Sequence, residues 1–400
     1  MNLSRRQILS SATAATMTTL APGVRVAFGA GQRDIIIALF LRFGADGLSM
    51  VPPADDGHYH DARPTLGIAA RDALPIGSLG GTPFFLHPAA PELKRLYDSG
   101  QLAIVQAAGM FANNRSHFIS QDMMERGLAD GDAAQSAGWL ARHLISTTPS
   151  LPTLGAIASA AQLDLRLQGY ASAVAIPDVA NFNVFGGDTN LNVINQMQAG
   201  SEAHVAAARE AVATIKSVQA GLATLPSAVG ETATYTNGFL SASLRSIATL
   251  IKMNVGLEAA AVDFYAWDHH VNLNLNFPPQ ARELSQSLAA FWNDLRDYRD
   301  RLTIVTMTEF GRRVEENANA GTDHGSASFM FVLGGNVNGG KIYGTWPGLA
   351  PAALHSGDLL VTTDYRTVLQ EILVKRRGEA SPQKVFPGVT YNPLGILRGS

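Results

Sequence analysis

Acidic and imidazole side chains gather in one short segment of the sequence. The segment TMTEFGRRVEENANAGTDHG, residues 306–325, follows the apolar run RLTIV, which is typical of a buried strand. It places Glu309, Asp323 and His324 beyond the carboxyl end of that strand, where open α/β sheets hold their sites. Carboxylate and imidazole groups together are ligands for a divalent metal ion. The residues alone leave a second interpretation open, a surface loop in which Asp323 caps a turn and Glu309 pairs with a neighbouring arginine.

Two further strand ends carry the same kinds of side chain. Asp46 follows the apolar run DIIIALFLRF and lies between two glycines, where it can bind a cation or form an Asx turn. Asp268 and His270 end the strand-like stretch before α-helical sequence resumes. Because the carboxyl ends of parallel strands share one edge of a sheet, we expect these acidic and imidazole groups to converge. The expected metal ligands are Asp46, Asp268, His270, Glu309, Asp323 and His324.

A serine occupies a predicted transition from strand to helix. The apolar run QLAIVQAAG leads to Asn113-Asn114-Arg115-Ser116-His117-Phe118, which opens a helix. The amide groups at the start of a helix favour an anion such as phosphate or sulfate, so Ser116 is a candidate nucleophile. Ser116 is equally consistent with an N-cap, the commoner role of serine at such a place.

Composition limits the class of protein. The chain has 400 residues, of which 46% are apolar, and this predicts one large α/β domain with insertions. The formal net charge is -3, so the protein has no net positive charge to attract the phosphates of a nucleic acid. Cysteine is absent, so disulfides, thiolate metal sites and cysteine nucleophiles are excluded. Any metal ion must be bound by oxygen and nitrogen.

The first thirty residues have the pattern of an export signal. Ser4-Arg5-Arg6-Gln7-Ile8-Leu9 is typical of a twin-arginine motif, and a weakly apolar stretch follows it. No later run reaches the roughly 18 apolar residues of a membrane span. We therefore predict that residues 1–30 are a signal peptide detached from residues 31–400, recognised by the twin-arginine translocase. The expected location is the periplasm or the cell exterior.

Alanine-rich helical sequence interrupts the strand pattern in the middle of the chain. Residues 181–254 hold a loop rich in asparagine and glycine, followed by two long helical stretches. We predict a helical insertion or cap on the sheet domain. A further amphipathic helix is predicted over residues 283–300, and the last long helix over residues 365–375.

Six motifs in fixed order give the chain a family resemblance. They are LFLRFGADGLSMVPP, NNRSHFISQDMME, WDHH, TEFGRR, GTDHGSASFMFVLGGNVNGGKIYG and VTTDYRTVLQEIL, behind the twin-arginine signal. Together they resemble the domain-of-unknown-function 1501 family of exported bacterial proteins. The resemblance implies the alkaline phosphatase and sulfatase superfamily, with a three-layer α/β/α sandwich around a mostly parallel sheet. It also implies Ser116 as nucleophile and Asp46, Asp268, His270, Glu309 and His324 as metal ligands. In the mechanism that we expect, His324 or Arg115 stabilises charge or assists the leaving group.

Two departures from the superfamily pattern bear on activity. Superfamily enzymes usually have Asp-His where this chain has Glu309-Phe310, and their middle motif spaces Asp and His more widely than Asp268 and His270. The expected function is an exported hydrolase of phosphate or sulfate esters, small or polysaccharide, that uses Zn, Mg, Mn or Ca. The alternative is a periplasmic binding or assembly protein on a degenerate sulfatase-like fold, without turnover.

Overall fold

The computed structural model describes most of the chain beyond the predicted signal. It describes residues 33–399 except 112–113, 130–131, 133, 148–153, 184–186, 188, 191, 193–202 and 225–232. The predicted signal peptide, residues 1–30, lies outside the described residues, as do parts of the predicted insertion. Among the helices that are described, none is both long enough and apolar enough to cross a membrane.

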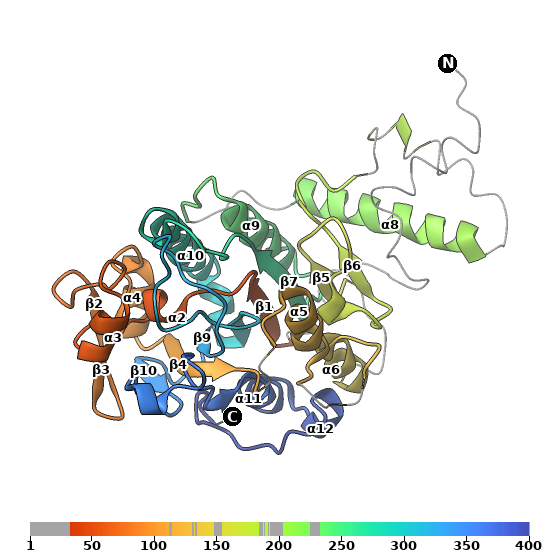
Figure 1. Ribbon diagram of the computed structural model, residues 1–400. Helices are drawn as coiled ribbons and strands as arrows, with labels where there is room; N and C mark the ends of the chain where they lie inside the picture. The colour runs from red at the N-terminus through yellow and green to blue at the C-terminus, as the bar shows by residue number, and fades with distance from the viewer. Residues whose placement is uncertain are drawn as a thin grey trace.

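A nine-stranded sheet forms the centre of the molecule (Figure 1). Its strands are β1 (Ile35–Leu41), β4 (Leu102–Gly109), β5 (Ala156–Ala158), β6 (Ala173–Ala175), β7 (Ala259–Phe264), β8 (Leu302–Met307), β9 (Ser328–Gly334), β10 (Lys341–Tyr343) and β11 (Thr363–Asp364). The order is β10-β4-β9-β8-β1-β7-β5-β6, with β11 beside β4. Only β9 runs antiparallel to its neighbours, β4 and β8. The mostly parallel sheet confirms the fold class predicted from the sequence.

Strand β1 is central because its sequence is apolar on both faces. All seven residues of IIIALFL are buried, as expected of a strand covered by helices on both sides. Parallel pairing places Ile36 opposite Ala259 of β7 and Ile35 opposite Leu302 of β8. The carboxyl ends of β1, β7 and β8 therefore share one edge of the sheet, and the loops that follow them lie together there.

Helices cover both faces of the sheet and complete three layers. Alternate residues of β1 belong to two separate apolar cores, with Ile37 and Leu39 in one and Ala38 and Phe40 in the other. The first core includes helices α4 (Pro91–Asp98), α8 (Ala203–Thr224), α9 (Phe239–Lys252) and α10 (Leu273–Asp294). The second includes α5 (His117–Arg126), α6 (Trp139–Thr147), α11 (Tyr365–Arg377) and α12 (Pro382–Val385). Figure 1 shows α9 and α10 on one side of the sheet and α11 and α12 on the other.

Short elements complete the fold. They are α2 (Gly47–Met50), α3 (Gly57–Ala62), the hairpin β2 (Leu74–Leu79) and β3 (Thr82–Leu86), and the 3-10 segments η1 (Leu165–Leu167), η3 (Arg296–Arg301) and η4 (Pro351–Ala353).

Helix α9 falls within the segment predicted to be an insertion, residues 181–254, yet it packs as part of a layer. Leu240, Leu244 and Ile247 of α9 are fully buried in the first core. The hydroxyls of Ser241 and Ser287 join α9 to α10 at 2.8 Å. The division of residues 181–254 from the sheet domain stays a prediction.

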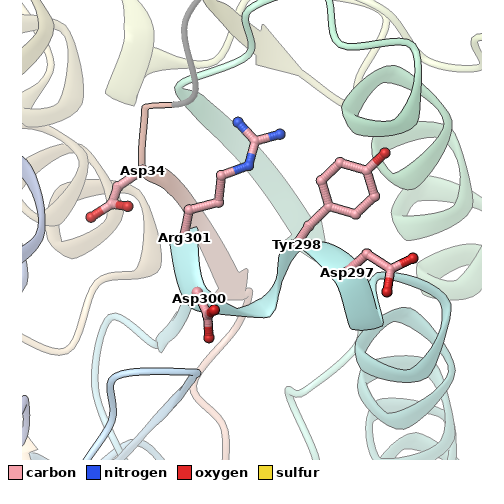
Figure 2. A pocket seen from close by; sticks show the side chains of 5 residues that line it. All are labelled: Asp34, Asp297, Tyr298, Asp300 and Arg301. Atoms are coloured by element: carbon pink, nitrogen blue, oxygen red, sulfur yellow. The ribbon is translucent and has the colours of Figure 1, made fainter.

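A cavity of about 290 Å³ opens at the amino-terminal edge of the sheet. Figure 2 shows its lining, which consists of Asp34 before β1 and Asp297, Tyr298, Asp300 and Arg301 before β8. Asp34 is already paired with Arg376, at 3.1 Å. This cavity lies at the opposite ends of the strands from the residues predicted to bind metal.

Candidate metal centre

Hydrogen bonds to two backbone carbonyls join the loop after β7 to the loop after β8. The amide of Thr322 donates to the carbonyl of His269 at 3.0 Å, and the side chain of Asn317 donates to the carbonyl of His270 at 3.0 Å. Gly321 makes this approach possible, because a Cβ there would lie 2.2 Å from the carbonyl of His270. The two loops that carry predicted ligands are thus held as one unit.

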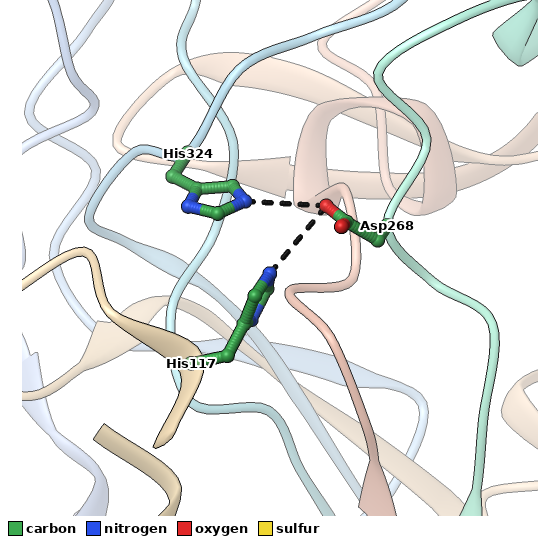
Figure 3. Close-up of side chains that lie close together, drawn as sticks. All are labelled: His117, Asp268 and His324. Atoms are coloured by element: carbon green, nitrogen blue, oxygen red, sulfur yellow. Dashed lines mark hydrogen bonds and ion pairs between the residues drawn. The ribbon is translucent and has the colours of Figure 1, made fainter. Parts of the chain in front are cut away.

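Four side chains converge at this edge of the sheet. Oδ1 of Asp268 lies 3.0 Å from Nε2 of His270, 3.2 Å from Nε2 of His324 and 3.5 Å from Nε2 of His117. The ligand atoms of His117, Asp268 and His324 all lie within 4.8 Å of one another, and Figure 3 shows both rings directed at the carboxylate. We call His117, Asp268, His270 and His324 the metal centre.

Each imidazole of the metal centre is oriented by a hydrogen bond at Nδ1. The acceptors are Glu309 for His117 (2.7 Å), Asp323 for His270 (2.9 Å) and the carbonyl oxygen of Arg115 for His324 (2.9 Å). A carbonyl or carboxylate oxygen accepts, so each ring donates from Nδ1 and, when neutral, carries a lone pair at Nε2. Oxygen acceptors of this kind fix the orientation of histidines that bind metal.

The Nε2 atoms of His270 and His324 lie close enough for a proton or a metal ion to join them. His270 and His324 hold their Nε2 atoms 3.0 Å apart, and a single proton would relieve the repulsion of only one such pair. Nε2 of His117 is buried and meets Oδ1 of Asp268 at 3.5 Å, a weak contact at the limit of a hydrogen bond. A divalent ion with bonds of about 2.0–2.2 Å places neighbouring ligands roughly 3.0–3.5 Å apart, the spacing of the contacts with Asp268. The ligand atoms of His117, Asp268 and His324 therefore fit a divalent metal ion, and His270 lies beside them against Asp268 and His324.

Arg312 supports the carboxylate of the metal centre. It is buried, and its guanidinium donates to Oδ1 of Asp268 at 2.6 Å and to the carbonyls of Phe43 and Gly44, both at 2.7 Å. Burial opposes ionisation of Asp268, but hydrogen bonds from His117, His324 and Arg312 outweigh it and hold its pKa well below the usual range. Asp268 is therefore an anion at any working pH.

The acceptor behind His117 is itself held by buried charges. Glu309 is fully buried and accepts from the amide of Phe43 at 2.9 Å and from the side chain of Gln121 at 2.7 Å. The amide oxygen of Gln121 accepts from Arg42 at 3.2 Å, and Arg42 pairs with Glu125 at 2.5 Å. Gln121 lies one helical turn after His117 on α5, so the helix meets Glu309 at two points and cannot easily rotate the imidazole away.

Asp46 lies outside the metal centre, contrary to the ligand set expected from strand ends. It N-caps α2 by accepting from the amide of Ser49 at 2.9 Å, and it pairs with buried Arg63 at 3.0 Å. Its other oxygen also accepts from the hydroxyl of Thr322, at 3.1 Å. Both carboxylate oxygens are thus occupied by protein donors, which leaves none directed at the metal centre.

Glu309 and Asp323 each contact a histidine of the metal centre and are not themselves directed at the ion site. Glu309 touches it only through the ring of His117, and Asp323 only through the ring of His270. The hydrogen bonds from His270 and Asn317 hold the pKa of Asp323 below its usual value. Both residues orient imidazoles, whereas the sequence suggested that they bind the ion themselves.

Ser116 and Arg115 lie beside the metal centre at the start of α5. Ser116 occupies the N-cap position and is half-buried, but its hydroxyl makes no capping hydrogen bond. The guanidinium of Arg115 pairs with buried Asp358 at 2.5 Å, while its carbonyl oxygen holds His324. The hydroxyl of Ser116 therefore does not cap α5. Ser116 lies between Arg115, which holds His324, and His117 of the metal centre.

His117 is the residue of the metal centre that the sequence interpretation did not include. It follows Ser116 directly in the motif Asn-Asn-Arg-Ser-His-Phe, in which only the serine was assigned a function, as candidate nucleophile. A histidine at the first position of a helix, close to a strand end, was the available signal. Its partner Glu309 is 192 residues away in the sequence, so spacing alone does not connect them.

Zinc binding is expected to weaken as the pH falls below about 9. Burial favours the neutral ring, but hydrogen bonds to Asp268 and Glu309 outweigh it and raise the pKa of His117 from 6.5 to about 9. The proton is therefore bound in the metal-free fold below that pH, and zinc must displace it. Apparent affinity should fall about tenfold per pH unit from this proton alone, measured by competition with a zinc-binding dye. Affinity that does not change between about pH 7 and pH 9 would contradict the assignment.

The family of the chain follows from comparison with known families. A family model described as "Protein of unknown function (DUF1501)" matches residues 103–378. The chain belongs to this family. The matched residues of this DUF1501 protein include all four members of the metal centre, and the resemblance recognised from the motifs is confirmed. No curated protein matches the sequence.

Several solved structures are similar to this DUF1501 protein at low identity. The lipoteichoic acid synthase LtaP from Listeria monocytogenes is 11% identical, with 86% of this chain and 78% of that chain covered and a TM-score of 0.32. Ps i-CgsB in complex with k-i-k-neocarrahexaose is 10% identical, with 83% and 75% covered and a TM-score of 0.34. An alkaline phosphatase from the Antarctic bacterium TAB5 is 8% identical, with 78% and 94% covered and a TM-score of 0.31.

Proposed function

We propose that this DUF1501 protein is an exported, metal-dependent hydrolase of phosphate or sulfate esters. The observation that carries the proposal is the metal centre, where three imidazoles, each fixed at Nδ1, present Nε2 to one ionised carboxylate. Three nitrogen ligands favour zinc or another transition metal over magnesium and calcium, which prefer oxygen. The twin-arginine pattern supports export to the periplasm or the cell exterior.

The chain supplies groups for binding the ester and for attack on it. A divalent ion, when bound, polarises a non-bridging oxygen of a phosphate or sulfate ester. We propose Ser116, whose hydroxyl at the start of α5 makes no capping hydrogen bond, as the nucleophile that attacks phosphorus or sulfur. The free amides at the amino end of α5, a helix of ten residues, favour the anionic ester there. Arg312 keeps Asp268 ionised and oriented throughout.

Metal content and turnover together test the proposed function. The protein, exported by its own signal in a twin-arginine-competent host and purified without chelators, is expected to hold about one zinc or other transition metal ion per chain. It is expected to hydrolyse members of a panel of phosphate and sulfate esters, and to lose that activity after chelation. Protein with no bound divalent ion and no turnover would instead support the non-catalytic binding or assembly protein.

Replacing Ser116 with alanine is expected to abolish turnover with little effect on folding. Its hydroxyl does not cap α5, so the variant should avoid the loss of about 1 kcal/mol that follows removal of a cap. Ser120, one turn later on α5, is the matched control because its hydroxyl donates to the carbonyl of Asn114 at 3.0 Å. Ser120→Ala should lower the melting temperature and leave activity per folded molecule unchanged. Wild-type kcat/KM in Ser116→Ala, measured beside its melting curve, would remove Ser116 from the mechanism.

A further inference from the structure

Three aromatic side chains form a strip that leads from the metal centre to the surface. Phe43 packs edge-on against His117 with ring centroids 5.3 Å apart, and Tyr265 lies 6.2 Å from Phe43. Phe239, the first residue of α9, lies 6.3 Å from Tyr265. Exposure rises along the strip, from half-buried Phe43 to Tyr265 at 45% and Phe239 at 58%. We call Phe43, Tyr265 and Phe239 the aromatic shelf.

The inner end of the aromatic shelf is fixed by residues that build the metal centre. Phe43 has a φ of 80°, which is strained for a bulky residue and persists only where the surroundings impose it. Its amide donates to Glu309 at 2.9 Å, and its carbonyl accepts from Arg312 at 2.7 Å. The position of the Phe43 ring is therefore set by the same contacts that orient His117 and Asp268.

Tyr265, in the middle of the shelf, turns its polar group toward the protein. Its hydroxyl donates to Asp263 at 3.1 Å, and burial together with that carboxylate raises the pKa of Tyr265 to about 12. The carbonyl of Tyr265 accepts from Gln280 at 3.0 Å, and the following residue, Ala266, has a φ of 72°. The loop thus holds the ring in place while the hydroxyl is occupied.

The composition of the aromatic shelf indicates the chemistry of its ligand. Phe43 and Phe239 have no hydrogen-bonding side-chain group, and that of Tyr265 is already paired. A sugar stacks its C–H face on a flat aromatic surface, but the rings of Phe43 and Phe239 are tilted by 42° and 67° from that of Tyr265. An aryl ring can pack edge-to-face or offset against rings tilted in this way. Exposed aromatic surface that continues into a site marks where an apolar ligand binds.

We propose that the aromatic shelf binds the aryl group of the ester whose phosphate or sulfate lies at the metal centre. The proposal rests on the proposed function and names its substrate class, aryl phosphates or aryl sulfates. A long alkyl chain offers related apolar chemistry, so the test includes one.

Binding of phosphonates, which are not hydrolysed, tests the shelf separately from turnover. The zinc-loaded full chain is titrated calorimetrically with methylphosphonate, benzylphosphonate and octylphosphonate, which share a head group. Wild-type protein is expected to bind benzylphosphonate at least about tenfold more tightly than methylphosphonate. The double variant Phe239→Ala and Tyr265→Ser should reduce that preference to below about threefold while binding methylphosphonate as before. Ile145→Ala, which removes an apolar side chain of similar exposure on α6, is the control and should keep the preference.

The outcomes separate the shelf from the function on which it rests. Equal affinity of the wild type for methylphosphonate and benzylphosphonate would contradict the proposal that the aromatic shelf binds an aryl group. It would leave anion binding at the metal centre intact. A benzyl preference that survives in the double variant, or octylphosphonate binding more tightly than benzylphosphonate, would also contradict that proposal. No binding of any phosphonate would contradict the proposed function itself.

Discussion

Replacing His117 with alanine is expected to lower the affinity of the protein for Zn²⁺ by roughly a hundredfold, because one metal ligand is lost. Structural zinc sites bind with about 10–16 kcal/mol, so one ligand accounts for on the order of 3 kcal/mol. His117 supplies a buried Nε2 atom that lies 3.5 Å from Oδ1 of Asp268, at the limit of a hydrogen bond. Competition with a chromophoric chelator, after removal of bound metal, measures the change.

Asp46→Asn is the matched control for this experiment. Asp46 also follows a strand end, but its oxygens accept from Ser49, Arg63 and Thr322 rather than facing the metal centre. Zinc affinity should stay within about threefold of wild type. The variant should be less stable by about 3–5 kcal/mol, because buried Arg63 loses its charged partner. If Asp46→Asn lost zinc affinity and His117→Ala kept it, Asp46 would be a metal ligand and His117 would not, as the strand ends alone predicted.

Strands and the edge that they share could be predicted because local sequence determines them. The apolar runs before Phe43, before the loop of Asp268 and before Glu309 became β1, β7 and β8, three parallel neighbours. Parallel neighbours bring the loops after their carboxyl ends together, whatever the loops contain. The sequence was therefore sufficient to predict that Asp268, His270 and His324 lie close together.

The sequence could not predict which polar residues face the metal centre and which orient its histidines, because this depends on long-range packing. Asp46 is diverted by Arg63, whose guanidinium also donates to the carbonyl of Val314 at 2.9 Å and so depends on the loop after β8. Glu309 becomes an orienting group only because α5 presents His117 and Gln121 to it. Nothing in the spacing of these residues encodes the direction in which each carboxylate points.

Helix α10 shows a similar limit at the level of secondary structure. The amphipathic pattern predicted a helix over residues 283–300, whereas the helix spans Leu273–Asp294 and includes Pro278 and Pro279. Proline in a helix interior usually ends it, but here both prolines lie within the helix. Phe277 and Ala281, on either side of them, are fully buried in the first core, and this packing favours the longer helix.

Replacing Arg312 with leucine is expected to lower the free energy of unfolding by about 3–5 kcal/mol, because several buried backbone carbonyls lose their donor at on the order of 1–2 kcal/mol each. Arg312 joins three loops, since it donates to the carbonyls of Gly44 after β1 (2.7 Å), Trp267 after β7 (3.1 Å) and Thr322 after β8 (3.1 Å). Its loss leaves these buried carbonyls without donors and Asp268 without its closest cation. Denaturant titration of chelator-treated protein measures the effect free of stabilisation by bound metal.

Arg313→Leu provides the comparison, because Arg313 is the next residue yet carries little of this structure. Its guanidinium is 30% exposed, lies 3.7 Å from Asp358 and donates to the carbonyl of Ser356 at 3.0 Å. A partly exposed pair of this kind contributes under about 1 kcal/mol, so Arg313→Leu should unfold close to wild type. If Arg312→Leu were no less stable than Arg313→Leu, the three loops would have to be held by their own backbone contacts. Arg312 would then act only on the ionisation of Asp268, and its replacement would change zinc affinity without changing stability.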